Sequence, residues 1–210
     1  MLKIHKIYPR GFGANTYVVT ANGKDAIVID PAQESIVEKV RELGLEAKYV
    51  LLTHCHFDHV RGVARLQNTG AKVLCSEQEK PLVHTRADLF ELFGAPREQF
   101  YYTIDQTFSD NETLNLCGIT IKTMLTPGHT AGSCVYEIIE KDGGRYLFTG
   151  DTLFQESIGR TDFPTGSMEE IRNSLKRLVC LDGDYILHSG HGEQTTLDEE
   201  RKYNLFLQDL

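Results

Sequence analysis

The feature that most constrains the fold is a block of metal-binding residue types directly after a short apolar run. The run Tyr49–Leu52 is unbroken, which favours a buried strand, and the sequence Thr-His-Cys-His-Phe-Asp-His follows it at residues 53–59. Apolar spacing after Gly62 predicts the start of a helix. The polar block is therefore expected at the carboxyl end of a strand, where open α/β sheets bind their ligands. Imidazole nitrogens and carboxylate oxygens are donors that zinc and similar divalent ions prefer.

Side-chain alternation within the block supports a metal site. His54 and His56 are two residues apart, so in an extended segment they leave the same side of the backbone, while Cys55 points to the opposite side as a packing residue. Asp58 and His59 then lie on the expected turn from the strand into the helix. Any one of these histidines alone is typical of the surface or the core. Together without a metal they would repel one another when protonated and would need many polar partners, so we interpret the block as metal-binding.

Three later segments repeat this design, in which an apolar strand ends at a metal-competent side chain. Their polar ends are Pro-Gly-His-Thr at 127–130, Thr-Gly-Asp at 149–151 and Gly-His-Gly at 190–192. A glycine beside each polar residue permits turn dihedrals and a close approach of the backbone to an ion. Each segment is a weak signal by itself. The seven residues together predict one metal centre: His54, His56, Asp58, His59, His129, Asp151 and His191.

The remaining patterns predict alternating strands and helices in one domain that spans residues 1–210. Strands are expected at 2–8, 16–20, 26–29, 49–52, 71–74, 112–116, 119–125, 133–139, 145–149 and 184–188, with a turn at 11–15. Helices are expected at 36–43, after residue 62, in a polar stretch that reaches about residue 99, at 167–178 and at 198–207. Both halves contain strands and helices, which favours two similar α/β halves with the sheets packed together and the helices outside.

Composition excludes several functional classes. The net charge of −8 disfavours nucleic-acid binding, which depends on Lys and Arg that neutralise phosphates. No apolar run approaches the length of a membrane helix and the amino terminus alternates, so we expect a cytoplasmic protein that does not bind membranes. The five cysteines are scattered without a C-x-x-C pair, which disfavours disulfides and a thiolate zinc site. The oligomeric state is left open.

These motifs resemble those of the metallo-β-lactamase superfamily over nearly the whole chain, from residue 15 to residue 204. Within it, Asp-Thr-Leu-Phe at 151–154 and Ile-Gly-Arg-Thr-Asp-Phe-Pro at 158–164 resemble the glyoxalase II group, especially its short bacterial members. The resemblance implies an αββα sandwich of two mixed sheets flanked by helices. It also implies two metal sites, the first from His54, His56 and His129, the second from Asp58, His59 and His191, with Asp151 as the bridge.

Such a centre implies hydrolysis. The expected cofactors are two divalent ions, zinc first, with iron or manganese as alternatives. Two ions roughly 3.5–4 Å apart can share a hydroxide that attacks a carbonyl, so neither a Ser-His-Asp triad nor an activated cysteine is needed. Asp58 and Asp151 are the expected catalytic carboxylates, Asp58 through proton handling and Asp151 through the bridge. The expected substrate is a small-molecule thioester such as S-lactoylglutathione.

The substrate itself is not specified by the motifs. Full-length glyoxalase II enzymes carry a carboxyl-terminal helical domain that supplies most glutathione-binding residues, and here 19 residues follow His191. A mononuclear iron persulfide dioxygenase is an alternative because its family shares the histidine block and a similar Gly-Arg-Thr-Asp-Phe segment, and a lactone hydrolase is another. A metal-binding module without activity is disfavoured because every ligand position is filled. Arg160 and Asp162 are expected either to brace their loop or a ligand histidine, or to form an ordinary surface ion pair.

Overall fold

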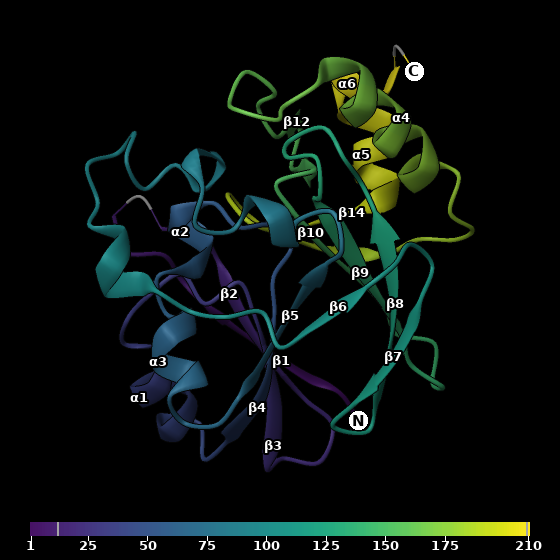
Figure 1. Cartoon of the computed structure of the whole chain (residues 1–210). Helices are drawn as coiled ribbons and strands as arrows, with labels where there is room; N and C mark the ends of the chain where they lie inside the picture. Colours follow the sequence, from purple (N-terminus) through teal and green to yellow (C-terminus); the bar gives the residue numbers. More distant parts are fainter. Residues whose placement is uncertain (12, 209) are drawn as a thin grey trace.

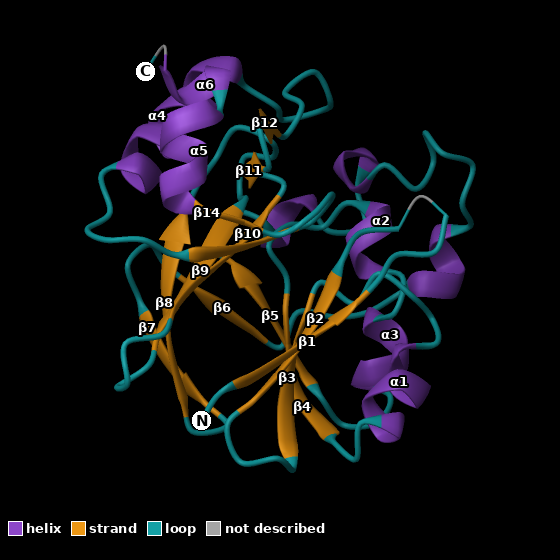
Figure 2. Cartoon of the chain, turned by 180° about the vertical axis from the view of Figure 1, so that it is seen from behind, coloured by secondary structure: helices purple, strands orange, loops and turns teal. Residues whose placement is uncertain are grey.

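The computed structural model describes residues 1–11, 13–208 and 210, so Phe12, in the turn expected at 11–15, and Asp209 lie outside the described residues. Two six-stranded sheets pack face to face, and helices cover both outer faces (Figures 1 and 2). This is the αββα arrangement of two mixed sheets that the resemblance implies.

The first sheet has the strand order β1-β2-β3-β4-β5-β6. Its strands are β1 (Lys3–Ile7), β2 (Thr16–Thr20), β3 (Asp25–Ile29), β4 (Glu46–Leu51), β5 (Lys72–Ser76) and β6 (Gln106–Phe108). The first three are antiparallel, and β3 to β6 run parallel.

The second sheet has the order β14-β13-β10-β9-β8-β7. Its strands are β7 (Thr113–Leu116), β8 (Ile119–Leu125), β9 (Cys134–Ile139), β10 (Arg145–Gly150), β13 (Ile186–Ser189) and β14 (Thr195–Thr196). Only β10 and β13 pair in parallel among these described strands. A small hairpin of β11 (Leu153–Phe154) and β12 (Ser157–Ile158) follows β10.

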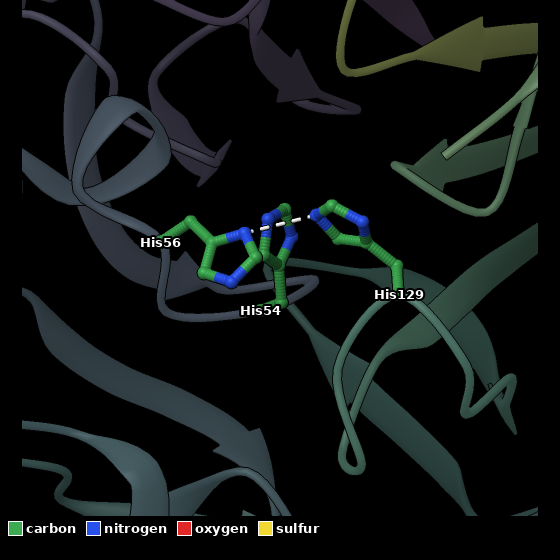
Figure 3. Close-up of side chains that lie close together, drawn as sticks. All are labelled: His54, His56 and His129. Atoms are coloured by element: carbon green, nitrogen blue, oxygen red, sulfur yellow. Dashed lines mark hydrogen bonds between the residues drawn. The ribbon is translucent and has the colours of Figure 1, made fainter. Parts of the chain in front are cut away.

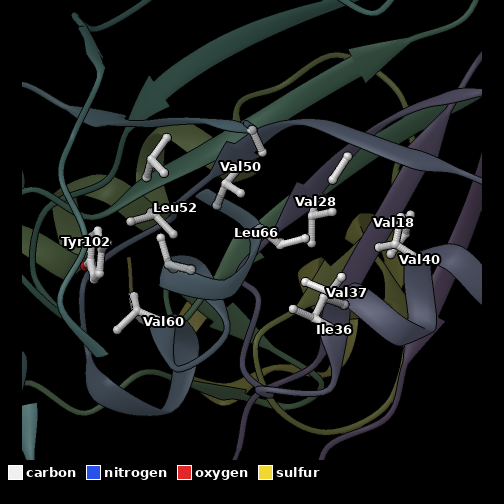
Figure 4. Packing of buried hydrophobic residues seen from close by; sticks show 14 of the residues in the cluster. Val18, Val28, Ile36, Val37, Val40, Val50, Leu52, Val60, Leu66 and Tyr102 are labelled. Carbon is white, nitrogen blue, oxygen red and sulfur yellow. The ribbon is translucent and has the colours of Figure 1, made fainter. Parts of the chain in front are cut away.

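Strand alternation divides the apolar residues among three cores. In β3, Ile27 and Ile29 face the second sheet, whereas Ala26 and Val28 face the helices. The core on the helix side of the first sheet packs against α1 (Ile36–Glu42), α2 (Phe57–Val60) and α3 (Val63–Gln67) (Figure 4). The third core joins the second sheet to α4 (Met168–Val179), α5 (Leu197–Tyr203) and α6 (Leu205–Gln208).

Two helix predictions were wrong. The polar stretch to about residue 99 contains only short 3-10 turns at η1 (Lys80–Leu82), η2 (Arg86–Asp88) and η3 (Arg97–Phe100). His84 and Leu89 adopt positive φ angles of 61° and 65°, which interrupt any helical ladder. The final helix breaks at Asn204, whose backbone is extended and whose side chain donates hydrogen bonds to Ser157 O and to Glu200.

The sequence patterns did not predict β6, β14 or the β11–β12 hairpin, which are only two or three residues long. Across the described part of the chain, no helix combines the length and the apolar character needed to cross a membrane.

Candidate metal centre

Four strand ends bring the seven predicted site residues together. His54 and His56 follow β4, Asp58 and His59 lie on α2, and His129 follows β8. Asp151 follows β10 and His191 follows β13. The structure therefore brings all seven to one place, in three overlapping groups whose candidate donor atoms lie within 4.8 Å of one another.

The first group is the histidine triad His54, His56 and His129 (Figure 3). His56 Nδ1 lies 2.9 Å from His129 Nε2, and the ring centroids of all three pairs are 4.6–4.8 Å apart. All three side chains are buried. Three imidazoles converge on one point from two different sheets.

The second group joins Asp58, His59 and His191. His191 Nε2 lies 3.2 Å from Asp58 Oδ2, and His59 Nε2 lies 4.0 Å from the same oxygen. His59 is fully buried, whereas the side chains of Asp58 and His191 are 17% and 37% exposed. This group is therefore the more accessible of the two.

Asp151 lies between the two groups. Its Oδ1 is 3.2 Å from His59 Nε2, and its Oδ2 is 3.5 Å from both His129 Nε2 and His191 Nε2. A Cβ added at Gly190 would clash with Asp151 Oδ1, so only glycine allows the backbone after β13 to pass the carboxylate this closely.

Unpaired buried atoms test whether these residues suit a metal. His54 Nε2, His59 Nε2 and Asp151 Oδ1 are buried and make no hydrogen bond of good geometry with any described residue. Such orphaned polar atoms are costly in a folded protein unless they have a partner. Nitrogen and carboxylate donors suit zinc and iron alike. The donor set and the orphaned atoms therefore fit divalent metal ions.

The protonation states of two triad histidines and of Asp151 suit ligation. Burial, together with the neighbouring histidines, lowers the pKa of His56 to about 3 and that of His54 well below its usual value. Burial alone would raise the pKa of Asp151, but the charges of His59 and His191 outweigh burial and hold that pKa well below its usual range. Near neutral pH the centre thus presents two imidazole lone pairs and a carboxylate.

Asp30 is a positioning residue that the sequence analysis missed. It directly follows β3, where it accepts hydrogen bonds from the Thr53 backbone N–H at 2.8 Å and the Thr53 hydroxyl at 2.6 Å. Its Oδ2 also lies 3.0 Å from His59 Nδ1. The carboxylate fixes the Nδ1–H of His59 as a donor and turns Nε2 toward the centre. Its sequence signal was the same as that of the ligands, a carboxylate at a strand end.

Glu79 is a second missed residue, and it joins the loops of the histidine triad. Its side chain is buried; one carboxylate oxygen accepts a hydrogen bond from Cys55 N at 2.7 Å, and the other accepts one from the Thr130 hydroxyl at 2.7 Å. Cys55 lies between His54 and His56, and Thr130 follows His129. No local pattern marks Glu79, because its partners are 24 and 51 residues away.

The loop after β12 holds His129 through its backbone. His129 Nδ1 donates to Arg160 O at 2.7 Å, which leaves Nε2 free. The Arg160 and Asp162 side chains instead pair with each other on the surface, through two hydrogen bonds of 2.6 Å. The two predictions made for these residues therefore each hold in part. Arg160 braces His129 through its backbone carbonyl, and its guanidinium forms a surface ion pair with Asp162.

A cavity of about 580 Å³ opens in front of the centre. It is lined by five of the seven residues, His56, Asp58, His129, Asp151 and His191, and by several aromatic side chains. Burial of His54 and His59 behind it leaves one open face for a small molecule.

The sequence model of the metallo-beta-lactamase superfamily matches residues 9–191. The chain belongs to the metallo-β-lactamase superfamily. A relative in this superfamily, the hydroxyacylglutathione hydrolase GloC of Haemophilus influenzae, is 35% identical, and the match covers 98% of each chain.

Solved metallo-β-lactamase-fold structures agree with this membership. The BLEG-1 B3 metallo-beta-lactamase has a TM-score of 0.84 and 31% identity, with 99% of both chains covered. TTHA1623, solved in a di-iron-bound form, has a TM-score of 0.79 and 31% identity over 96% of this chain and all of its own. The metallo-β-lactamase fold expected from the motifs is therefore confirmed, and the chain is a member of a metallo-hydrolase superfamily.

Proposed function

We propose that the protein is a binuclear metal-dependent hydrolase that cleaves acyl thioesters of the S-lactoylglutathione type. One observation carries the proposal: two groups of donors, each complete enough to hold an ion, meet at the carboxylate of Asp151, which faces His129 of the first group and His59 and His191 of the second. The name of the GloC relative, a hydroxyacylglutathione hydrolase, supports thioesters as the substrate class.

His54, His56 and His129 would hold the first ion, and Asp58, His59 and His191 the second, with Asp151 between them. Zinc is the proposed metal because imidazole and carboxylate donors suit it, and the di-iron form of TTHA1623 makes iron the first alternative. When bound, a pair of divalent ions lowers the pKa of water and polarises a carbonyl oxygen, which is the chemistry that thioester cleavage needs.

The chain's own residues would prepare this centre. Asp30 and the Arg160 carbonyl hold protons on the Nδ1 atoms of His59 and His129, so that their Nε2 atoms face inward. Asp58 lines the cavity and faces His191 through Oδ2, which leaves its Oδ1 to accept a proton during turnover.

Metal content per chain and a substrate panel test the proposal. We expect two divalent ions per chain by elemental analysis and hydrolysis of S-lactoylglutathione by the same preparation. A different result would assign a persulfide dioxygenase instead: one iron per chain, consumption of oxygen in the presence of glutathione persulfide, and no cleavage of thioesters. Cleavage of a lactone but of no thioester would show that the protein is a lactone hydrolase.

A further inference from the structure

The walls of the cavity are apolar where they rise above the candidate ligands. Six side chains form them, from α2, the loop around η2, the β11–β12 hairpin and the loop after it: Phe57, Leu89, Phe93, Phe154, Ile158 and Phe163. Apart from the candidate ligands, Arg160 is the one charged residue among the described residues that line the cavity.

On one side, aromatic rings form a continuous surface from the centre to the opening. The Phe163 ring lies edge-on to His56 at 6.0 Å and to Phe93 at 6.2 Å. Phe93 in turn stacks on Phe57 at 4.7 Å, yet Phe93 remains 52% exposed. An apolar surface that begins at a ligand histidine and stays open is suited to the apolar part of a bound molecule.

The opposite wall is held in place by the carboxyl-terminal helices. Phe154 lies edge-on to His191 at 6.0 Å. The hairpin that carries it is fixed because Glu200 accepts a hydrogen bond from Glu156 N at 2.7 Å and Asn204 donates one to Ser157 O at 3.1 Å. This wall, next to His191, is thus anchored to the carboxyl-terminal helices.

Arg160, the one Arg or Lys among the described lining residues, is already paired. Arg160 donates from Nε and from a terminal nitrogen to the two oxygens of Asp162, and its guanidinium carbon lies 3.8 Å from the Phe163 ring centroid. A glutathione group carries two carboxylates, whose recognition calls for cationic or other strong donors. The described lining offers no second cation for them.

We infer that the cavity selects thioesters by an apolar acyl group rather than by a charged thiol such as glutathione. The inference rests on the proposed hydrolase function. The carbonyl must reach the candidate ligands, so its acyl substituent lies against the nearest apolar wall, whereas the thiol has to leave through the opening. In the reaction, the oxygen of water bonds to the acyl carbon and the carbon–sulfur bond breaks. The products are a carboxylate, the thiol and one released proton.

The test uses the metal-loaded full chain and two series of thioesters. Acetyl, butyryl and hexanoyl groups are attached either to glutathione or to the uncharged thiol N-acetylcysteamine, and S-lactoylglutathione is the reference. Full burial of one methylene changes a rate constant by about fourfold, so kcat/KM should rise at least about tenfold from acetyl to hexanoyl on either thiol. Exchange of the thiol at a given acyl group should change kcat/KM by less than about threefold.

A matched pair of variants locates the selectivity. Phe93 and Leu92 are adjacent, large, apolar and exposed, at 52% and 64%, but only Phe93 lines this cavity. Phe93→Ala should reduce the hexanoyl-to-acetyl ratio to below about threefold, whereas Leu92→Ala should retain the ratio of the unaltered protein.

Each other result has a distinct meaning. If kcat/KM does not depend on acyl length, or depends only on whether the thiol is glutathione, the inference is overturned and the hydrolase function stays intact. If Phe93→Ala retains the hexanoyl-to-acetyl ratio of kcat/KM, the aromatic wall is not the source of the selectivity. Failure of the metal-loaded protein to cleave any thioester would overturn the proposed function, and the inference with it.

Discussion

Asp30 Oδ2 lies 3.0 Å from His59 Nδ1, although the two residues are 29 positions apart and neither one faces solvent. The contact joins the end of β3 to α2, beside the candidate centre. It determines which nitrogen of His59 faces Asp58 and Asp151, so Asp30, which is not itself a candidate ligand, controls the geometry of the second group through His59.

Asp30→Asn should weaken metal binding at the second group. The amide holds the Nδ1 proton of His59 less firmly than the carboxylate does, and loss of such a partner typically costs about 10- to 100-fold in metal affinity. Metal titration should show one site weakened and the histidine triad retained. Asp25→Asn, at the opposite end of β3, is the matched control and should bind both ions as before. Equal affinities in the two variants would contradict a role for Asp30.

Glu79→Gln and Glu79→Ala should loosen the histidine triad in a graded way. Removal of the carboxylate leaves the buried Cys55 N–H without an acceptor and leaves the Thr130 hydroxyl with Ser133 Oγ alone, at a cost of about 1–3 kcal/mol in the free energy of unfolding. Competition with a chelator should show faster metal loss from Glu79→Ala than from Glu79→Gln. Glu77→Gln, two residues earlier and exposed, is the control. If metal is lost no faster from Glu79→Ala than from the control, Glu79 does not position the loops.

Asp151→Ala should remove both metal ions and turnover together, because Asp151 is the carboxylate that faces both groups. Elemental analysis and thioester hydrolysis on the same sample measure the two effects. His84→Ala is the comparison, because His84 lies away from the centre, where its Nε2 contacts Tyr102 O. Full metal content with retained activity in Asp151→Ala would disprove the bridge.

His188 should make the fold sensitive to acid. It packs against the rings of Tyr17, Tyr146 and Phe148, and burial together with the Lys6 charge lowers its pKa to about 4. The unfolded chain takes up this proton near pH 6.5, so the unfolded state binds more protons between about pH 6.5 and 4, and stability falls as the pH falls through that window.

His188→Phe keeps an aromatic ring in this cluster and removes the titration. The free energy of unfolding, measured by denaturant at several pH values with metal held constant, should fall less steeply on acidification, by up to about 3 kcal/mol at pH 4. Titration of the candidate ligand histidines is common to both proteins and cancels in the difference. Parallel curves for the two proteins would show that His188 contributes nothing to acid sensitivity.

Local pattern was enough to predict most of the strands and all seven residues that the structure brings together. Each of those residues follows an apolar run or lies on the turn into a helix, and such runs are read from neighbours along the chain. The same reasoning failed between residues 80 and 100, where positive φ angles at His84 and Leu89 break the chain into short turns. These conformations are stabilised by distant contacts, such as that of His84 with Tyr102, and leave no periodic signal.

The sequence by itself determined which side chains have metal-binding chemistry and where the strands that carry them end. Only the tertiary structure decided that Asp30 and Glu79 hold those side chains, and that Phe93 and Phe163 line the cavity in front of them. The physical reason is that donor chemistry belongs to a residue, whereas a buried hydrogen bond or a cavity wall depends on segments that meet only when the two sheets pack.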